Sequence, residues 1–74
     1  MRAPSPITAA RDVGRAAADS IAPGTRAKEI PFRLKARLRI ALKRNASESE
    51  LVIAERTFRR HRAAALQKMI EGAD

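Results

Sequence analysis

The sequence predicts an all-α fold, a small three-helix domain with a C-terminal helical hairpin. Apolar residues recur at helical spacing in three stretches, and helix-start signals precede the first stretch at Ser5-Pro6 and the last at Ser47–Glu50. Turn-forming residues separate the stretches. We expect helices at about residues 6–21, 31–44 and 48–71, with the last two paired as an antiparallel hairpin.

The length and the composition limit how stable this fold is. Seventy-four residues form at most one small domain, whose single core supplies only a few kcal/mol. The chain has no cysteine and only two aromatic residues, Phe32 and Phe58, so it lacks disulfides, thiolate metal sites and large core anchors. We therefore expect a marginal monomer that gains stability from a partner or as a homo-oligomer. Residues 1–30 would be a flexible tail with a weak amphipathic helix and linker, and residues 31–74 a basic helical hairpin.

The composition also bears on where the protein works. No apolar run approaches the about 18–20 residues that span a bilayer, so we expect no transmembrane segment. The lack of cysteine and of an apolar signal region favours a cytoplasmic protein. The Arg- and Ala-rich N-terminus also fits a transit peptide, but Asp12 and Asp19 count against it because such presequences avoid acids. Arginine outnumbers lysine twelve to four, which is typical of a GC-rich bacterial genome.

The first predicted helix begins with Ser5 as its N-cap and Pro6 at its first position. Its apolar stripe is thin and consists mainly of small residues, Ile7, Ala10, Val13, Gly14, Ala17 and Ile21. Small side chains on one face allow close contact with another helix. The same thin stripe is also compatible with a helix that frays in isolation.

The second predicted helix follows a break at Ala22–Thr25 and a polar linker that ends at Ile30. Ile30 precedes Pro31 and is expected to be extended, so the helix would begin at Pro31. Its apolar stripe consists of Leu34, Leu38, Ala41 and Leu42, which leaves Phe32 and Ile40 off the main face. Residues 33–40 also alternate basic and apolar residues as strands do, but their helix-favouring composition decides for a helix.

The third predicted helix follows a turn in which Asn45 takes a left-handed conformation. Ser47 and Glu50 fit a capping box, and Gly72 fits the end of the helix. One face carries the apolar stripe and the single histidine, as Leu51, Ala54, Phe58, His61, Ala65 and Met69. The opposite face carries Arg56, Arg59, Arg60 and Gln67, with Arg62 at the border of the stripe.

The positive charge is concentrated in the second helix. The net charge is +2 over residues 1–30, +6 over 31–44 and 0 over 45–74. The +6 segment holds Arg33, Lys35, Arg37, Arg39, Lys43 and Arg44 and no acid. Genome bias explains the preference for arginine over lysine but does not explain a local excess of this size, which indicates a surface that binds a polyanion.

Catalytic chemistry has little support in the sequence. His61 is the only histidine, cysteine and tyrosine are absent, and the three glycines are isolated, so no nucleophile–base pair or phosphate loop can be named. His61 fits a partly buried structural residue, and Glu48 and Glu50 fit capping roles better than metal binding. We expect no enzyme activity, no catalytic residue, no metal site and no cofactor.

Residues 54–69, AERTFRRHRAAALQKM, resemble the recognition helix of bacterial helix-turn-helix regulators, which often reads S-E-R-T-hydrophobic-R-R followed by Ala, Leu and Lys. The resemblance implies that Arg56, Thr57, Arg59, Arg60 and Arg62 face DNA while Phe58 and Leu66 pack inward. A solvated arginine face is an equally good explanation of the same residues.

We therefore predict a small basic nucleic-acid-binding protein, a DNA-associated regulator or accessory factor, with RNA as an alternative target. Its contacts would come from the six basic residues of the second helix together with Arg56, Arg59, Arg60 and Arg62. The main alternative is an adaptor whose helix 31–44 docks on an acidic protein partner through Leu34, Leu38 and Phe32. A third possibility places the same helix on anionic lipid.

Overall fold

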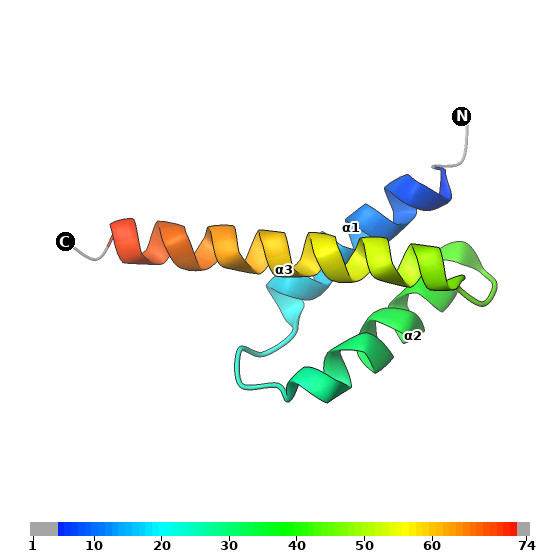
Figure 1. Ribbon diagram of the computed structural model, residues 1–74, viewed down its shortest axis with the longest axis horizontal. Helices are drawn as coiled ribbons and strands as arrows, with labels where there is room; N and C mark the ends of the chain where they lie inside the picture. The colour runs from blue at the N-terminus through cyan, green and yellow to red at the C-terminus, as the bar shows by residue number, and fades with distance from the viewer. Residues whose placement is uncertain (1–4, 73–74) are drawn as a thin grey trace.

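The computed structural model describes residues 5–72 and contains three α-helices and one short 3₁₀ turn (Figure 1). The helices are α1 (Pro6–Ser20), α2 (Ile30–Leu42) and α3 (Glu48–Glu71), and the turn is η1 (Ala27–Glu29). The all-α prediction is confirmed, and each helix end lies within two residues of its predicted position. The loose segment predicted at the start of the chain lies largely outside the described residues.

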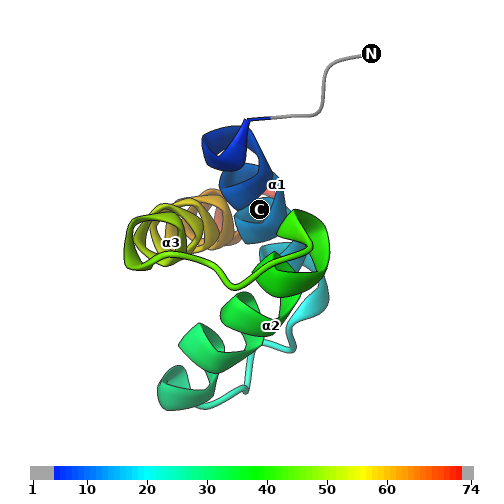
Figure 2. The same ribbon diagram turned by 90° about the vertical axis from the view of Figure 1, so that its right-hand side faces the viewer.

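The long helix α3 is the axis around which the other two helices are arranged. α2 and α3 are joined by the turn at residues 43–47, and they diverge from that turn as Figure 1 shows. α1 crosses α3 and packs against it more extensively than α2 does, while it also contacts α2 (Figure 2). The last two helices thus follow each other across a short turn, as in the predicted hairpin, but they diverge, and α1 contacts both of them.

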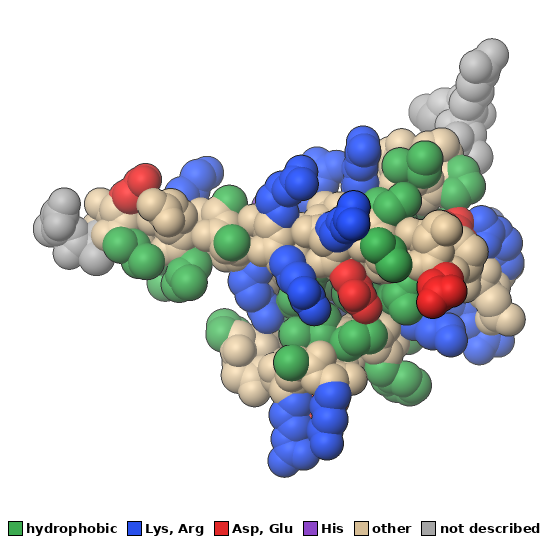
Figure 3. All heavy atoms as spheres, viewed as in Figure 1, with side chains coloured by type: hydrophobic (Ala, Val, Ile, Leu, Met, Phe, Trp, Pro, Cys, Tyr) green, Lys and Arg blue, Asp and Glu red, His purple; other side chains and the backbone are tan. Residues whose placement is uncertain are grey.

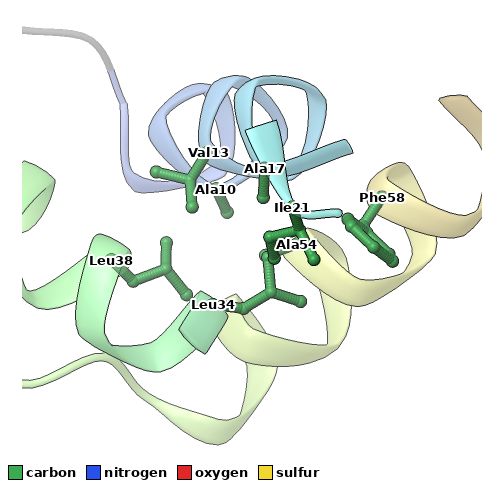
Figure 4. Packing of buried hydrophobic residues seen from close by; sticks show 8 residues of the cluster. All are labelled: Ala10, Val13, Ala17, Ile21, Leu34, Leu38, Ala54 and Phe58. Atoms are coloured by element: carbon green, nitrogen blue, oxygen red, sulfur yellow. The ribbon is translucent and has the colours of Figure 1, made fainter. Parts of the chain in front are cut away.

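The core lies where the three helices meet (Figure 4). It consists of eight buried residues, Ala10, Val13, Ala17, Ile21, Leu34, Leu38, Ala54 and Phe58. Leu34 and Leu38 are the only large side chains that are completely buried among the described residues. Because three of the eight are alanines, the core buries little apolar area.

At Gly14, α1 and α3 approach each other closely. A β-carbon added at Gly14 would lie 2.6 Å from the carbonyl oxygen of Ala54 and 2.8 Å from Cβ of Thr57. No side chain fits in that space, so the backbones approach as closely as only glycine permits. The small residues of the first helix do allow close helix contact, as the sequence predicted.

The start of α2 differs from the prediction. Ile30 is helical, with φ −61° and ψ −49°, and its amide donates to the carbonyl of Ala27. The expected extended conformation before Pro31 is therefore wrong, and so is the expectation of a plain linker up to Ile30. The physical reason is that η1 runs directly into α2, which places the half-buried Ile30 side chain against the core and outweighs the local preference.

The turn between α2 and α3 also departs from the prediction in one respect. Lys43, not Asn45, takes the left-handed conformation, with φ 59°. α2 ends at Leu42, so the residue that must reverse the chain comes two positions earlier than expected. The reversal brings the next residue, Arg44, to Glu50 of α3.

The start of α3 is fixed by a capping box that Arg44 completes. The Ser47 amide donates to Oε1 of Glu50 at 2.6 Å, and the Glu50 amide donates to Oγ of Ser47 at 3.2 Å. The Arg44 guanidinium donates to both carboxylate oxygens of the buried Glu50, at 2.9 and 2.6 Å. The hydrogen bonds from Arg44 and then from Ser47 lower the pKa of Glu50 from 4.5 to about 2. The predicted capping box is confirmed.

Glu50 should make the stability of the domain depend on pH in the acid range. Because its folded-state pKa is lowered, its ionised form stabilises the fold above about pH 4.5, and this contribution is lost as the pH falls towards about 2. We expect the thermal midpoint of the natural protein to fall more steeply across this window than that of Glu50→Gln, as followed by circular dichroism. Glu48→Gln, which removes an exposed acid from the same helical turn, is the control. Equal slopes for the natural protein and Glu50→Gln would contradict this role.

Candidate nucleic-acid interface

The exposed side of α2 carries an apolar centre between two basic edges, and we call this side the α2 outer face. Its centre is formed by Phe32, Ala36 and Ile40, one helical turn apart, and Phe32 and Ile40 are 77% and 78% exposed. One edge carries Lys35, Arg39 and Lys43 at the same spacing, and the other carries Arg33 and Arg37. Leu34 and Leu38 point the other way, into the core, and this fixes which residues remain outside.

Most cations of the α2 outer face take part in no ion pair with another described residue. Among the ion pairs found within residues 5–72, none involves Lys35, Arg37, Arg39 or Lys43. Arg33 lies 3.9 Å from Glu29, and both side chains are about half exposed, so this pair is weak. The free cations are therefore available to an external anion.

An open groove of about 1080 Å³ runs along this face and continues onto the turn at Arg44–Ala46. Phe32, Ala36 and Ile40 supply its apolar lining, and Lys35, Arg39 and Lys43 supply its charge. The groove can thus hold a chain that presents anions at its edges.

Arg44 differs from the other basic residues of its segment. Its guanidinium is bound to Glu50, and this hydrogen bond raises the pKa of Arg44 above its ordinary value. Its charge is therefore largely compensated inside the domain. Arg44 is therefore a predicted binding residue whose guanidinium instead takes part in the hydrogen-bond network that caps α3.

The arginines of α3 lie apart from the α2 outer face. Arg56 and Arg60 are exposed and one turn apart, on the side of α3 away from the buried Ala54 and Phe58. Arg59 is exposed as well and lines a second groove, between α3 and the start of α2. The structure thus presents two separate basic surfaces, and it does not merge the predicted residues into one.

Arg62 and Thr57 face the domain itself. Arg62 donates to the carbonyl of Ile21 at 2.5 Å, and its guanidinium lies 4.5 Å from the centroid of the Phe58 ring. Thr57 lies at the Gly14 contact with α1. These two of the five residues that the helix-turn-helix resemblance directs towards DNA therefore help to join α3 to α1.

The helix-turn-helix resemblance also implies two packing residues, Phe58 and Leu66, and only one of them is buried. Phe58 is buried as expected, whereas Leu66 is 58% exposed, so the expectation that it packs inward is wrong. The reason is that α3 runs past the buried cluster, whose last residue on this helix is Phe58, so Leu66 only lines an open groove beside the start of α2. His61 is half-buried, and its Nε2 lies 3.0 Å from Oδ1 of Asp19 at the end of α1.

The anchors of the adaptor hypothesis need a correction. Leu34 and Leu38 are completely buried in the core of this chain, so they cannot insert into another protein. Phe32 and Ile40 occupy the exposed position instead. Ile40 is not among the anchors predicted above, although the apolar residues at 32, 36 and 40 form a second helical stripe in the sequence.

No group of three or more His, Cys, Asp or Glu side chains within residues 5–72 is arranged to hold a metal ion. Over the same residues, no helix combines the length and the hydrophobicity that crossing a membrane requires. Comparison with protein-family models, with curated proteins and with solved structures gives no match for this chain. We therefore assign no family, and the functional argument depends on the geometry of the two basic surfaces.

Proposed function

We propose that this protein binds nucleic acid by phosphate contact through the α2 outer face, with DNA as the main target and RNA as the alternative. The observation that carries the proposal is the set of four exposed cations, Lys35, Arg37, Arg39 and Lys43, none of which takes part in an ion pair within residues 5–72. Each phosphate that they neutralise would release condensed counterions, which favours binding at low salt.

The geometry of the longer basic edge supports this proposal. Lys35 and Arg39 lie one helical turn apart on α2 and Lys43 follows directly after its last residue, so the three backbone positions span about 12 Å along the helix axis. A DNA strand carries one phosphate per about 3.4 Å of duplex axis, so a row aligned with that axis would face about three or four phosphates. Contacts of this kind position a protein on a duplex without reading its sequence.

As part of the same proposal, the protein is a cytoplasmic, DNA-associated regulator or accessory factor. The exposed Arg56, Arg59 and Arg60 of α3 supply a second contact for a long polyanion. Two copies in one particle would double the α2 outer face and raise the affinity for a long duplex through simultaneous contacts.

The test is binding of random duplex DNA across a salt series, with duplex RNA measured in parallel. The expected result is binding at low salt that weakens with a slope of log K against log salt of about −4, because each of four phosphate contacts contributes about −0.9. The triple variant Lys35→Gln, Arg39→Gln, Lys43→Gln should lower the magnitude of that slope by about 2 to 3.

A matched variant identifies which surface carries the binding. Arg56→Gln, Arg59→Gln, Arg60→Gln removes the same number of charges from α3, and we expect a smaller loss of slope. A larger loss in the α3 variant would transfer the interface to α3. If the natural protein fails to bind either duplex at low salt, phosphate contact is wrong.

The exposure of Phe32 and Ile40 favours a second candidate, an acidic protein partner that docks on the same face. Binding of phosphates does not bury the two large apolar side chains at the centre of this basic groove. An acidic amphipathic segment would bury both. The double variant Phe32→Ala, Ile40→Ala separates the candidates within the same salt series. Retained DNA binding by this variant supports phosphate contact, and loss of binding with charge unchanged contradicts it.

A further inference from the structure

The last part of α3 extends from the domain with its side chains exposed to solvent. Every residue from Ala63 to Gly72 is exposed, although the helix continues to Glu71. Three large apolar side chains lie on this segment, Leu66 at 58%, Met69 at 71% and Ile70 at 63% exposure. Figure 3 shows hydrophobic side chains gathered along one side of the free end of α3. We call residues 63–71 the α3 tail.

A mainly apolar groove leads directly to this tail. It lies between α3 and the start of α2 and has a volume of about 410 Å³. Ile30, Pro31, Phe58 and Ala63 supply apolar lining, with Arg59 among the charged residues that also line it. Leu66 belongs both to the groove and to the tail, so one continuous apolar strip runs from the domain onto the free helix end.

We propose that two copies of this chain associate through the α3 tail, with the two α3 helices antiparallel and each tail lying in the groove of the other copy. The groove and the tail lie on the same face of α3. A two-fold axis near residue 64 would therefore place the tail of each copy on the groove of the other copy. Such a contact is isologous and closes at two copies. It does not depend on the proposed function, since the α2 outer face stays free.

Charge decides for a second copy over other occupants. The chain carries a net charge of +8, so two copies repel each other over most of their surfaces. The α3 tail is the exception, because Lys68 and Glu71 balance each other there. The neutral, apolar α3 tail offers a polyanion or an acidic partner no excess of positive charge to bind, but it lets two cationic copies approach.

The antiparallel orientation follows from the ends of the helix. The C-terminal end of α3 carries a partial negative charge from its unpaired carbonyls, to which Glu71 adds. In the antiparallel arrangement this end lies beside the Arg59 that lines the opposing groove. A parallel arrangement would instead bring two negative helix ends together.

The mass of the particle in solution tests the proposal. We expect sedimentation equilibrium of the natural protein to give twice the chain mass of 8.1 kDa at high concentration. The variant Leu66→Lys, Ile70→Lys should remain at the chain mass with unchanged helicity by circular dichroism. The matched variant Phe32→Lys, Ile40→Lys places the same charges on similarly exposed residues of α2 and should still dimerise. A natural protein that stays at the chain mass overturns the proposal, as does dissociation by the α2 variant alone.

Spin labels test the orientation, because the chain has no natural cysteine. In an antiparallel pair, labels on Ala64→Cys lie near the axis, whereas labels on Glu71→Cys are separated by an additional helix length on the order of 20 Å. The distance measured between copies should therefore be clearly longer at position 71. An equal or shorter distance at position 71 overturns the antiparallel arrangement.

Discussion

Gly14→Val is expected to remove most of the free energy of unfolding of the protein at ambient temperature. A β-carbon at this position would lie 2.6 Å from the carbonyl oxygen of Ala54, which belongs to the backbone of α3 and cannot move aside alone. α1 and α3 would have to separate, and overpacking of this kind costs about 3 kcal/mol. A domain of this size has a total stability of only about 3–5 kcal/mol. Valine is a better helix former than glycine by only a few tenths of a kcal/mol, so the local gain offsets little of the loss.

Urea unfolding followed by circular dichroism measures this effect, at one fixed protein concentration. Gly14→Ala should fall between the natural protein and Gly14→Val, because alanine gains about 1 kcal/mol of helix propensity while it meets the same carbonyl oxygen. Gly24→Ala is the control, since no atom lies within 4 Å of a β-carbon there. Unchanged stability of Gly14→Val would show that the close α1–α3 contact is absent in solution.

Leu38→Ala should have an effect of similar size for the opposite reason, because it empties the core instead of overfilling it. Leu38 is completely buried at the meeting point of α1 and α2 (Figure 4). Removing a buried leucine costs about 2–5 kcal/mol, and Leu34→Ala belongs to the same range. Since these are the two large side chains that the described part of the chain buries completely, either loss approaches the total stability of the domain.

Phe32→Ala is the matched control on the same helix. Its side chain is 77% exposed, so its removal should change the free energy of unfolding by less than about 0.5 kcal/mol. Equal losses for Leu38→Ala and Phe32→Ala in chemical unfolding would contradict the orientation of α2. The comparison also shows why alanine variants of Leu34 and Leu38 cannot test docking on a partner, whereas Phe32→Ala can.

The local signals of this sequence are sufficient to predict its three helices. The capping box of Ser47 and Glu50, the Ser5-Pro6 start and the periodic leucines depend on neighbours within one or two helical turns, and all three predictions are confirmed. The predictions that are wrong concern the junctions between consecutive elements. The helical Ile30 and the left-handed Lys43 are set by how neighbouring elements join, which no short segment encodes alone.

The candidate site could be predicted from the sequence only in part. The concentration of charge in residues 31–44 is a property of the sequence, and the structure leaves most of these cations exposed. Which cations remain free depends on contacts between segments far apart in the chain. Arg44 binds Glu50 and Arg62 binds the end of α1, and neither pairing follows from spacing on one helix.

By itself the sequence determined the all-α class, the three helices and the strongly basic second helix, because propensity, capping and charge act over a few residues. Only the tertiary structure decided that α1 is the main partner of α3, since this contact depends on Gly14 meeting a backbone forty residues away. The tertiary structure also decided that Leu34 and Leu38 are buried in the core, while Phe32, Ile40 and the α3 tail stay exposed. An amphipathic stripe shows that a helix must be covered, but the identity of the cover is a property of the assembled fold.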